Sequence, residues 1–181
     1  MANRQLILLR HAKSDWSSGA RSDFDRPLNA RGRRDAPRVG RWLADNGYTP
    51  DCIVASPSAR TTETVELALD AMRATLDSSP TESESESEVH LGEVIFESRL
   101  YHGMTDDIRA IAAAHLADFE RVLVVAHNPG MELALRAYCR SCAPFADGKF
   151  MPTCACAVID LASADAADGA LRALTRPSDL P

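Results

Sequence analysis

The 181-residue chain lacks a long apolar run and an excess of positive charge. Its apolar run near the N-terminus, Leu6 to Leu9, is far shorter than a membrane span or a signal-peptide core, and Arg10 ends it. The formal charge of −6 disfavours nucleic acids and anionic membranes as partners, because the net field repels both. These absences predict a cytoplasmic protein with no nucleic-acid partner and no membrane partner.

Two signatures of nucleotide and metal chemistry are also missing. The chain has no Walker-type glycine loop, which would hold the phosphates of a nucleotide, and no cluster of carboxylates that would bind magnesium. A phosphate site in this chain would therefore neutralise its ligand with cationic side chains, without a metal ion.

The five cysteines are an odd number, and a reducing compartment disfavours a disulfide framework. Cys139 and Cys142 form a CxxC, and Cys154 and Cys156 form a CxC, so together they could imitate a four-thiolate zinc site. Alternatively, Cys154 and Cys156 lie on one face of a buried strand and pack as small apolar residues, with Cys139 at a helix end. We favour packing, and the zinc site remains the alternative.

Short apolar segments alternate with helical segments along the chain. Strands are predicted at Gln5 to Leu9, Asp51 to Ala55, Val94 to Phe96, Arg121 to Ala126, Thr153 to Leu161 and Ala170 to Leu174. Helices are predicted from the cap Asn29 to Asn46, with Pro37 leaving its regular start open, from Thr61 to Met72, after the cap Thr105, and from Asn128. This order predicts a three-layer α/β/α sandwich with a mostly parallel central sheet and an antiparallel edge strand.

One domain over residues 1–181 accounts for this alternation, since the strand and helix rhythm continues to the end of the chain. The stretch from Asp77 to Glu88 consists almost entirely of serine and acidic residues, so it is of low complexity and has nothing to bury. We interpret it as a solvated insertion within the domain and not as a domain boundary.

Cationic side chains follow three of the predicted strands. Ligands of open α/β sheets bind outside the carboxyl ends of the strands, where Arg10 with His11, Arg60 and His127 would meet. Guanidinium groups match phosphoryl oxygens, and surrounding cations keep a histidine neutral and nucleophilic. We therefore predict a phosphate pocket in which His11 attacks phosphorus, with Asn128 at the next helix as a further substrate-binding residue.

Four ordered motifs carry a family resemblance: LLRHAKSDW, DRPLNARGRRDA, SPSARTTET and AHNPGME. With them the chain resembles the phosphoglycerate mutase-like histidine phosphatase superfamily, and within it the small phosphohistidine phosphatases of the SixA type. The resemblance implies that His11 is the phosphorylated nucleophile, that Arg10 and Arg60 bind phosphate, and that His127 is the second pocket histidine. It also implies that the enzyme needs no cofactor and works as a single compact unit, which we expect to be a monomer.

Larger relatives carry a carboxylate that protonates the leaving oxygen, and this chain has no well-matched glutamate. Glu97, Asp15 and Asp25 are the available candidates, although Asp15 and Asp25 have a simpler interpretation as turn or arginine contacts. An alkoxide needs that proton, whereas the imidazole of a phosphohistidine can leave as a neutral ring. The missing acid therefore favours a protein-borne phosphohistidine as the substrate.

Two other functions remain open from the sequence. One is a phosphatase or mutase that acts on a small phosphate ester, which would need a general acid and further substrate-binding loops. The other is a non-catalytic module that binds phosphate or a phosphoprotein in the same pocket. A nucleophilic histidine beside Arg10 favours the enzyme, because recognition alone does not require one.

Overall fold

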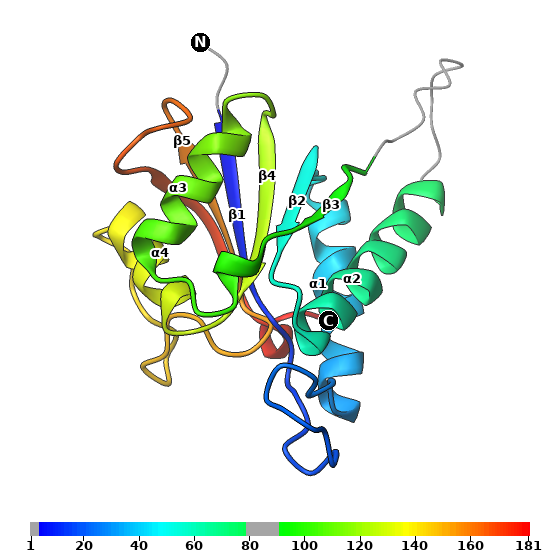
Figure 1. Ribbon diagram of the computed structural model, residues 1–181. Helices are drawn as coiled ribbons and strands as arrows, with labels where there is room; N and C mark the ends of the chain where they lie inside the picture. The colour runs from blue at the N-terminus through cyan, green and yellow to red at the C-terminus, as the bar shows by residue number, and fades with distance from the viewer. Residues whose placement is uncertain (1–3, 79–90) are drawn as a thin grey trace.

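The computed structural model describes residues 4–78 and 91–181, and it shows a sheet with helices on both faces (Figure 1). The described ranges contain six strands in the order β3-β2-β4-β1-β5-β6. Their bounds are β1 Arg4–Arg10, β2 Cys52–Ala55, β3 Val94–Phe96, β4 Arg121–Ala126, β5 Cys156–Leu161 and β6 Ala170–Thr175.

The strand directions confirm the predicted sheet. Strands β3, β2, β4 and β1 pair in parallel, whereas β5 runs antiparallel to β1 and β6 runs antiparallel to β5. The antiparallel strand is therefore β5, and β6 forms the edge beside it. The parallel strands are apolar along most of their length because helices cover both of their faces.

Helices cover both faces of the sheet (Figure 1). Helices α1 Ala30–Asp45 and α2 Ala59–Ser78 lie on one face, and α3 Thr105–Leu116 and α4 Gly130–Tyr138 lie on the other. Strand β1 shows why both faces are buried: Leu6 and Leu8 point towards α3 and α4, whereas Ile7 and Leu9 point towards α1 and α2. No helix of the described ranges is both long and apolar enough to cross a membrane.

The caps of α1 behave as predicted, and its proline does not delay its start. The side chain of Asn29 accepts a hydrogen bond of 2.9 Å from the Gly32 amide, and the helix begins at Ala30. Pro37 therefore lies inside a continuous helix. Gly47 follows the helix with a φ of 71°, a left-handed conformation that favours glycine.

Several predicted boundaries differ from the structure by one to three residues, and those of α3, α4 and β5 are instructive. Thr105 is the first residue of α3 and Met104 occupies the cap position, where the Asp107 carboxylate accepts from its amide. Helix α4 begins at Gly130 and not at Asn128, because Pro129 takes the cap position. Strand β5 begins at Cys156, three residues after the predicted start.

Cys154 explains the late start of β5. It has a φ of 62°, and its amide lies 3.1 Å from the carbonyl oxygens of both Arg10 and His11. The chain thus crosses the end of β1 before it can pair with it as a strand. Cys154 and Cys156 are both fully buried on the same side of the sheet, but only Cys156 is part of a strand.

The predicted acidic insertion from Asp77 to Glu88 lies mostly outside the described residues. Helix α2 is longer than the predicted Thr61 to Met72 and extends to Ser78, so Asp77 and Ser78 are helical rather than part of a loop. The continuation of the helix past Met72 follows from Ala74 and Leu76, which keep its composition favourable.

Candidate active site

The candidate site forms where three parallel strands end side by side. Arg10, the last residue of β1, pairs with Ala126, the last residue of β4. The next residues are His11 and His127, and the His11 amide donates a 3.1 Å hydrogen bond to the Ala126 carbonyl. The Ser56 amide, just after β2, bonds the Val125 carbonyl at 3.0 Å. The sheet register therefore brings both histidines to one edge.

His11 is buried, with 7% of its surface exposed. Its Nδ1 lies 2.7 Å from the carbonyl oxygen of Ala12. Because a carbonyl oxygen only accepts, Nδ1 carries the ring proton and Nε2 keeps its lone pair. Burial, together with the charges of His127, Arg60 and Arg10, lowers the pKa of His11 from 6.5 to about 3. At neutral pH His11 is thus an uncharged imidazole with a free nucleophilic nitrogen.

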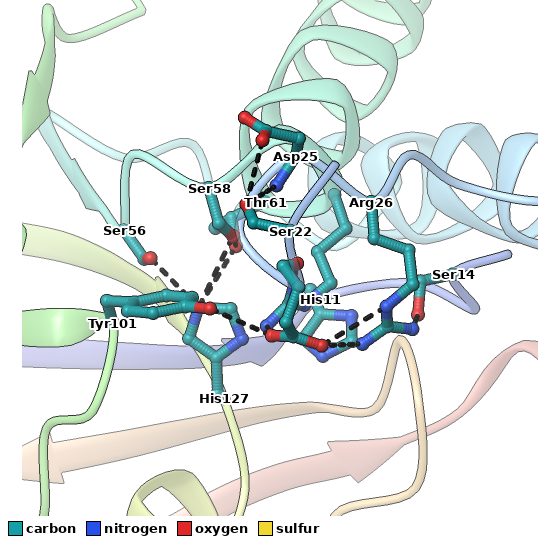
Figure 2. A network of polar contacts seen from close by, with 12 residues as sticks. His11, Ser14, Ser22, Asp25, Arg26, Ser56, Ser58, Thr61, Tyr101 and His127 are labelled. Atoms are coloured by element: carbon teal, nitrogen blue, oxygen red, sulfur yellow. Dashed lines mark hydrogen bonds and ion pairs between the residues drawn. The ribbon is translucent and has the colours of Figure 1, made fainter. Parts of the chain in front are cut away.

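His127 lies beside His11, with 5.0 Å between the ring centroids (Figure 2). Its Nε2 is 2.8 Å from the Ser56 hydroxyl, and Ser58 and Thr61 lie at 3.5 and 3.4 Å. Burial, and then the charge of Arg60, lowers the pKa of His127 to about 3. Both pocket histidines are therefore neutral while no anion is bound.

The two predicted arginines come from different elements and are held by different partners. Arg10 Nη1 donates to the Met151 carbonyl at 2.8 Å. Arg60, in the first turn of α2, donates to the Asp23 carbonyl at 2.6 Å and to the Asp23 carboxylate at 3.0 Å. Among the described residues neither Nε has a partner, although both are buried. Buried donors without a protein partner are rare, and a catalytic role or a bound water or ion can account for them.

Asp23 is a central residue of the site that the sequence did not identify. Its carboxylate accepts from Arg60, from Arg26 Nη2 at 2.6 Å and from the Tyr101 hydroxyl at 2.8 Å. These bonds, that from Arg26 above all, hold the pKa of Asp23 well below its usual range. The negatively charged Asp23 thus links two buried guanidinium groups through charge-assisted hydrogen bonds.

Arg26 is the third arginine of the site, and it was also missed. It is 8% exposed, it hydrogen-bonds the Ser14 hydroxyl, and its guanidinium stacks 3.7 Å from the centre of the exposed Trp16 ring. Figure 2 shows Ser14, Arg26, Tyr101 and the two histidines within one polar network. Nothing in the spacing of Asp23 and Arg26 distinguishes them from other loop residues, so only the fold could reveal them.

A small cavity of about 210 Å³ connects these groups. Its lining includes Arg10, His11, Arg26, Arg60, His127 and Asn128, and the described lining residues include no aspartate or glutamate. The Asn128 amide nitrogen donates to the Met151 carbonyl at 3.0 Å, and its Oδ1 is buried with no partner among the described residues. The structure therefore brings the five predicted substrate-contacting residues into one compact, cationic pocket.

The three candidate general acids lie outside this lining. Glu97 caps the 3₁₀ turn Ser98–Leu100, and the bond from Arg99 lowers its pKa. Asp15 accepts from Ser17, which lowers its pKa too, and Asp25 accepts from the Ser22 hydroxyl at 2.7 Å. A general acid must carry a proton at neutral pH, and a lowered pKa opposes this.

The four cysteines of the CxxC and CxC lie on opposite faces of the sheet. Cys139 and Cys142 pack with α3 and α4, whereas Cys154 and Cys156 pack with α1 and α2. This separation excludes the four-thiolate zinc site. In residues 4–78 and 91–181 no group of three or more metal-binding side chains comes together.

The lowered histidine pKa values predict a loss of stability in acid. Folded His11 and His127 titrate near 3, whereas the same groups titrate near 6.5 when unfolded. Between these values the unfolded chain binds more protons, so the free energy of unfolding falls as pH drops below 6.5. Urea unfolding at about pH 7.5 and about pH 5 should show this fall, and it should be smaller in His11→Gln. Equal falls in both proteins would contradict the shift at His11.

Asp23 should act as a positioning residue for Arg60 and Arg26. Asp23→Asn keeps the shape but removes the charge that holds both guanidinium groups, so kcat/KM should fall by roughly 10- to 100-fold with a mainly unchanged fold. Asp25→Asn is the matched control, because the Asp25 side chain hydrogen-bonds Ser22 and neither guanidinium group. Phosphate release and circular dichroism measure both effects. Equal activity in the two variants would contradict the role of Asp23.

The model of the histidine phosphatase superfamily (branch 1) matches residues 6–102. This match covers more than half of the chain and includes His11, just after β1, and Arg60, in the first turn of α2. His127 lies outside the matched residues, so its assignment as the second pocket histidine depends on the geometry described above.

Two curated relatives match over part of their length. An uncharacterised chloroplast protein of Arabidopsis thaliana is 33% identical over 134 residues, which are 73% of this chain and 57% of that protein. A 2,3-bisphosphoglycerate-dependent phosphoglycerate mutase of Corynebacterium efficiens is 38% identical over 73 residues, which are 39% of this chain and 29% of the mutase. The matched segments therefore span little more than half of one relative and less than a third of the other.

Solved structures match over nearly the whole chain. A candidate phosphohistidine phosphatase SixA of Nakamurella multipartitia superposes with a TM-score of 0.75 at 26% identity, covering 98% of both chains. The protein histidine phosphatase SixA in complex with tungstate has the same fold, with a TM-score of 0.75 at 20% identity over 97% of this chain and 98% of that one. Both structures share the fold of this protein, and the family match shows that the chain belongs to the histidine phosphatase superfamily.

Proposed function

We propose that the protein is a phosphohistidine phosphatase that transfers a phosphoryl group from a protein-borne phosphohistidine to His11 and then to water. The observation that carries this proposal is the combination of a neutral, buried His11 with a cavity lining that holds no carboxylic acid among its described residues. Such a site can attack phosphorus, but it offers no carboxylic acid that would protonate an alkoxide leaving group.

The first step exchanges one nitrogen–phosphorus bond for another. The Nε2 lone pair of His11 forms a bond to phosphorus, and the bond from phosphorus to the substrate imidazole breaks. The electron pair of that bond stays on the substrate nitrogen, and the ring leaves uncharged if its other nitrogen carries a proton. The Ala12 carbonyl keeps the Nδ1 proton on His11, so the phosphorylated ring is cationic and itself a good leaving group.

Water completes the cycle. Its oxygen bonds to phosphorus, the bond to His11 Nε2 breaks, and the electron pair returns to the ring as its lone pair. The two protons of the water either stay on the inorganic phosphate or pass to the solvent. His11 is then neutral again, with its proton on Nδ1 as before.

Side chains of the protein would neutralise the charge of the phosphoryl group, as a metal ion does in other phosphatases. Arg10 and Arg60 would contact the equatorial oxygens as charge spreads over them, and Asn128 lies beside them in the lining. A bound phosphoryl dianion would raise the pKa of His127, because an opposite charge favours the protonated form, and would make it a charged donor. We therefore expect the activity to be independent of metal and cofactor.

A phosphatase or mutase acting on a small phosphomonoester is the second candidate. The partial likeness to a phosphoglycerate mutase supports it. The placements of Glu97, Asp15 and Asp25 away from the cavity lining weigh against it, since an alkoxide leaving group needs an acid there.

Phosphate release from a phosphohistidine peptide and from a small alkyl phosphate ester, whose alkoxide leaving group needs an acid, should separate these functions. We expect higher kcat/KM for the peptide and loss of both activities in His11→Ala. His115→Ala is the matched control, because His115 lies on α3 at Cys52 and away from the cavity lining. Preference for the ester would favour the second candidate, and release that does not depend on His11 would contradict the catalytic assignment, leaving a binding module.

A further inference from the structure

A second hollow, which we call the basic groove, lies beside the catalytic cavity. Its volume is about 510 Å³, and it shares Arg10, Lys13 and Thr153 with the cavity. Four separate segments build it: the loop after β1, the first turn of α1, the connection before β5 and the chain around the 3₁₀ turn Pro177–Asp179. The two hollows are therefore neighbours that share part of their lining.

The basic groove is strongly cationic on a chain that is acidic. Arg10, Lys13, Arg31, Lys149 and Arg176 contribute positive charge to its lining, against the single carboxylate of Asp147 among the described lining residues. Lys13 and Lys149 are the only two lysines in the sequence. The formal charge of the whole chain is −6, but the positive charges gathered in the groove create a local field that attracts anions.

Two of these cations, Lys13 and Lys149, are free to bind a ligand, whereas Arg31 pairs with the buried Asp35 at 3.2 Å. Lys149 pairs with Asp147 at 3.1 Å, but both side chains are exposed, by 65% and 41%, and such pairs contribute little in water. For Lys13 no side-chain partner occurs among the described residues. Arg176 differs, because it contacts Asp147 and Asp179 and stacks 4.4 Å from the Phe145 ring, so it forms a fixed wall.

The lining favours an extended peptide over a small molecule. Pockets for small ligands are mostly apolar and enclose most of their ligand, whereas here cations from four segments line a partly open hollow. Rim charges of this kind steer and orient a macromolecular partner. We propose that the basic groove binds an acidic segment of the phosphoprotein substrate and so guides its phosphohistidine into the catalytic cavity.

This inference rests on the proposed function, and it predicts a preference among substrates. Two phosphohistidine peptides of equal length, one flanked by Asp and Glu and one by Asn and Gln, should differ in KM, with the lower value for the acidic peptide. Lys149→Glu should reduce this preference by about five- to tenfold, because it removes one attraction and adds a repulsion. Added salt should reduce it as well.

Arg73→Glu is the matched control. Arg73 pairs with Asp70 at 3.2 Å and is 54% exposed, much as Lys149 is with Asp147, but it lies on α2 outside the groove lining. Arg73→Glu changes the net charge by the same amount as Lys149→Glu, but the preference for the acidic peptide should remain. Equal KM values for the two peptides in the wild-type protein, or an equal loss in both variants, would overturn the inference.

Direct binding distinguishes a failure of the groove from a failure of the catalytic proposal. A fluorescein-labelled acidic peptide without phosphohistidine should bind the wild-type protein and bind Lys149→Glu more weakly, whether or not any peptide is hydrolysed. Citrate, a small tricarboxylate, should compete no better than its ionic strength explains. Binding equal in both proteins, or efficient competition by citrate at constant ionic strength, would contradict an acidic peptide as the occupant.

Discussion

Concentrating positive charge in a small buried space is the constraint on which the rest of the site depends. Three arginines and two histidines meet around a cavity of about 210 Å³, and their mutual repulsion opposes folding. The molecule lowers this cost in two ways: the single charge of Asp23 offsets part of the charge of Arg26 and Arg60, and the two histidines, whose pKa values are lowered mainly by burial, carry no charge. The second response leaves His11 with the free lone pair that its proposed role as nucleophile requires.

The sheet supplies the precision that this arrangement needs. Because β1 and β4 pair in parallel up to Arg10 and Ala126, the residues after them cannot drift apart. Cys154 holds the end of β1 from the other side through the Arg10 and His11 carbonyls. His11 is thus fixed by main-chain bonds from two directions, and its ring is fixed by Ala12. A site built on strand ends is held more rigidly than one on loops.

The features that could be predicted from sequence are those that depend on local patterns. Apolar runs in the sequence predicted β1 and β4. Because parallel strands end at the same edge of a sheet, the sequence also predicted that Arg10, His11 and His127 lie together there. Asp23 and Arg26 could not be found in this way, because their loop acquires its shape from contacts with Arg60 and Tyr101, which are distant in sequence. The predicted start of β5 was wrong for the same reason. Hydrogen bonds to the end of β1 set the position of Cys154, and the alternation of polar and apolar residues in its own segment does not.

The central claim is that His11 carries the phosphoryl group, and trapping the enzyme during turnover tests it most directly. Denaturing the protein within its first turnover on a phosphohistidine peptide, followed by mass spectrometry of its fragments, should find one phosphate on the fragment that holds His11. The phosphate should be lost in acid and retained in alkali, as for a nitrogen–phosphorus bond. A phosphate on another residue, or turnover without any phosphorylated enzyme, would contradict the account.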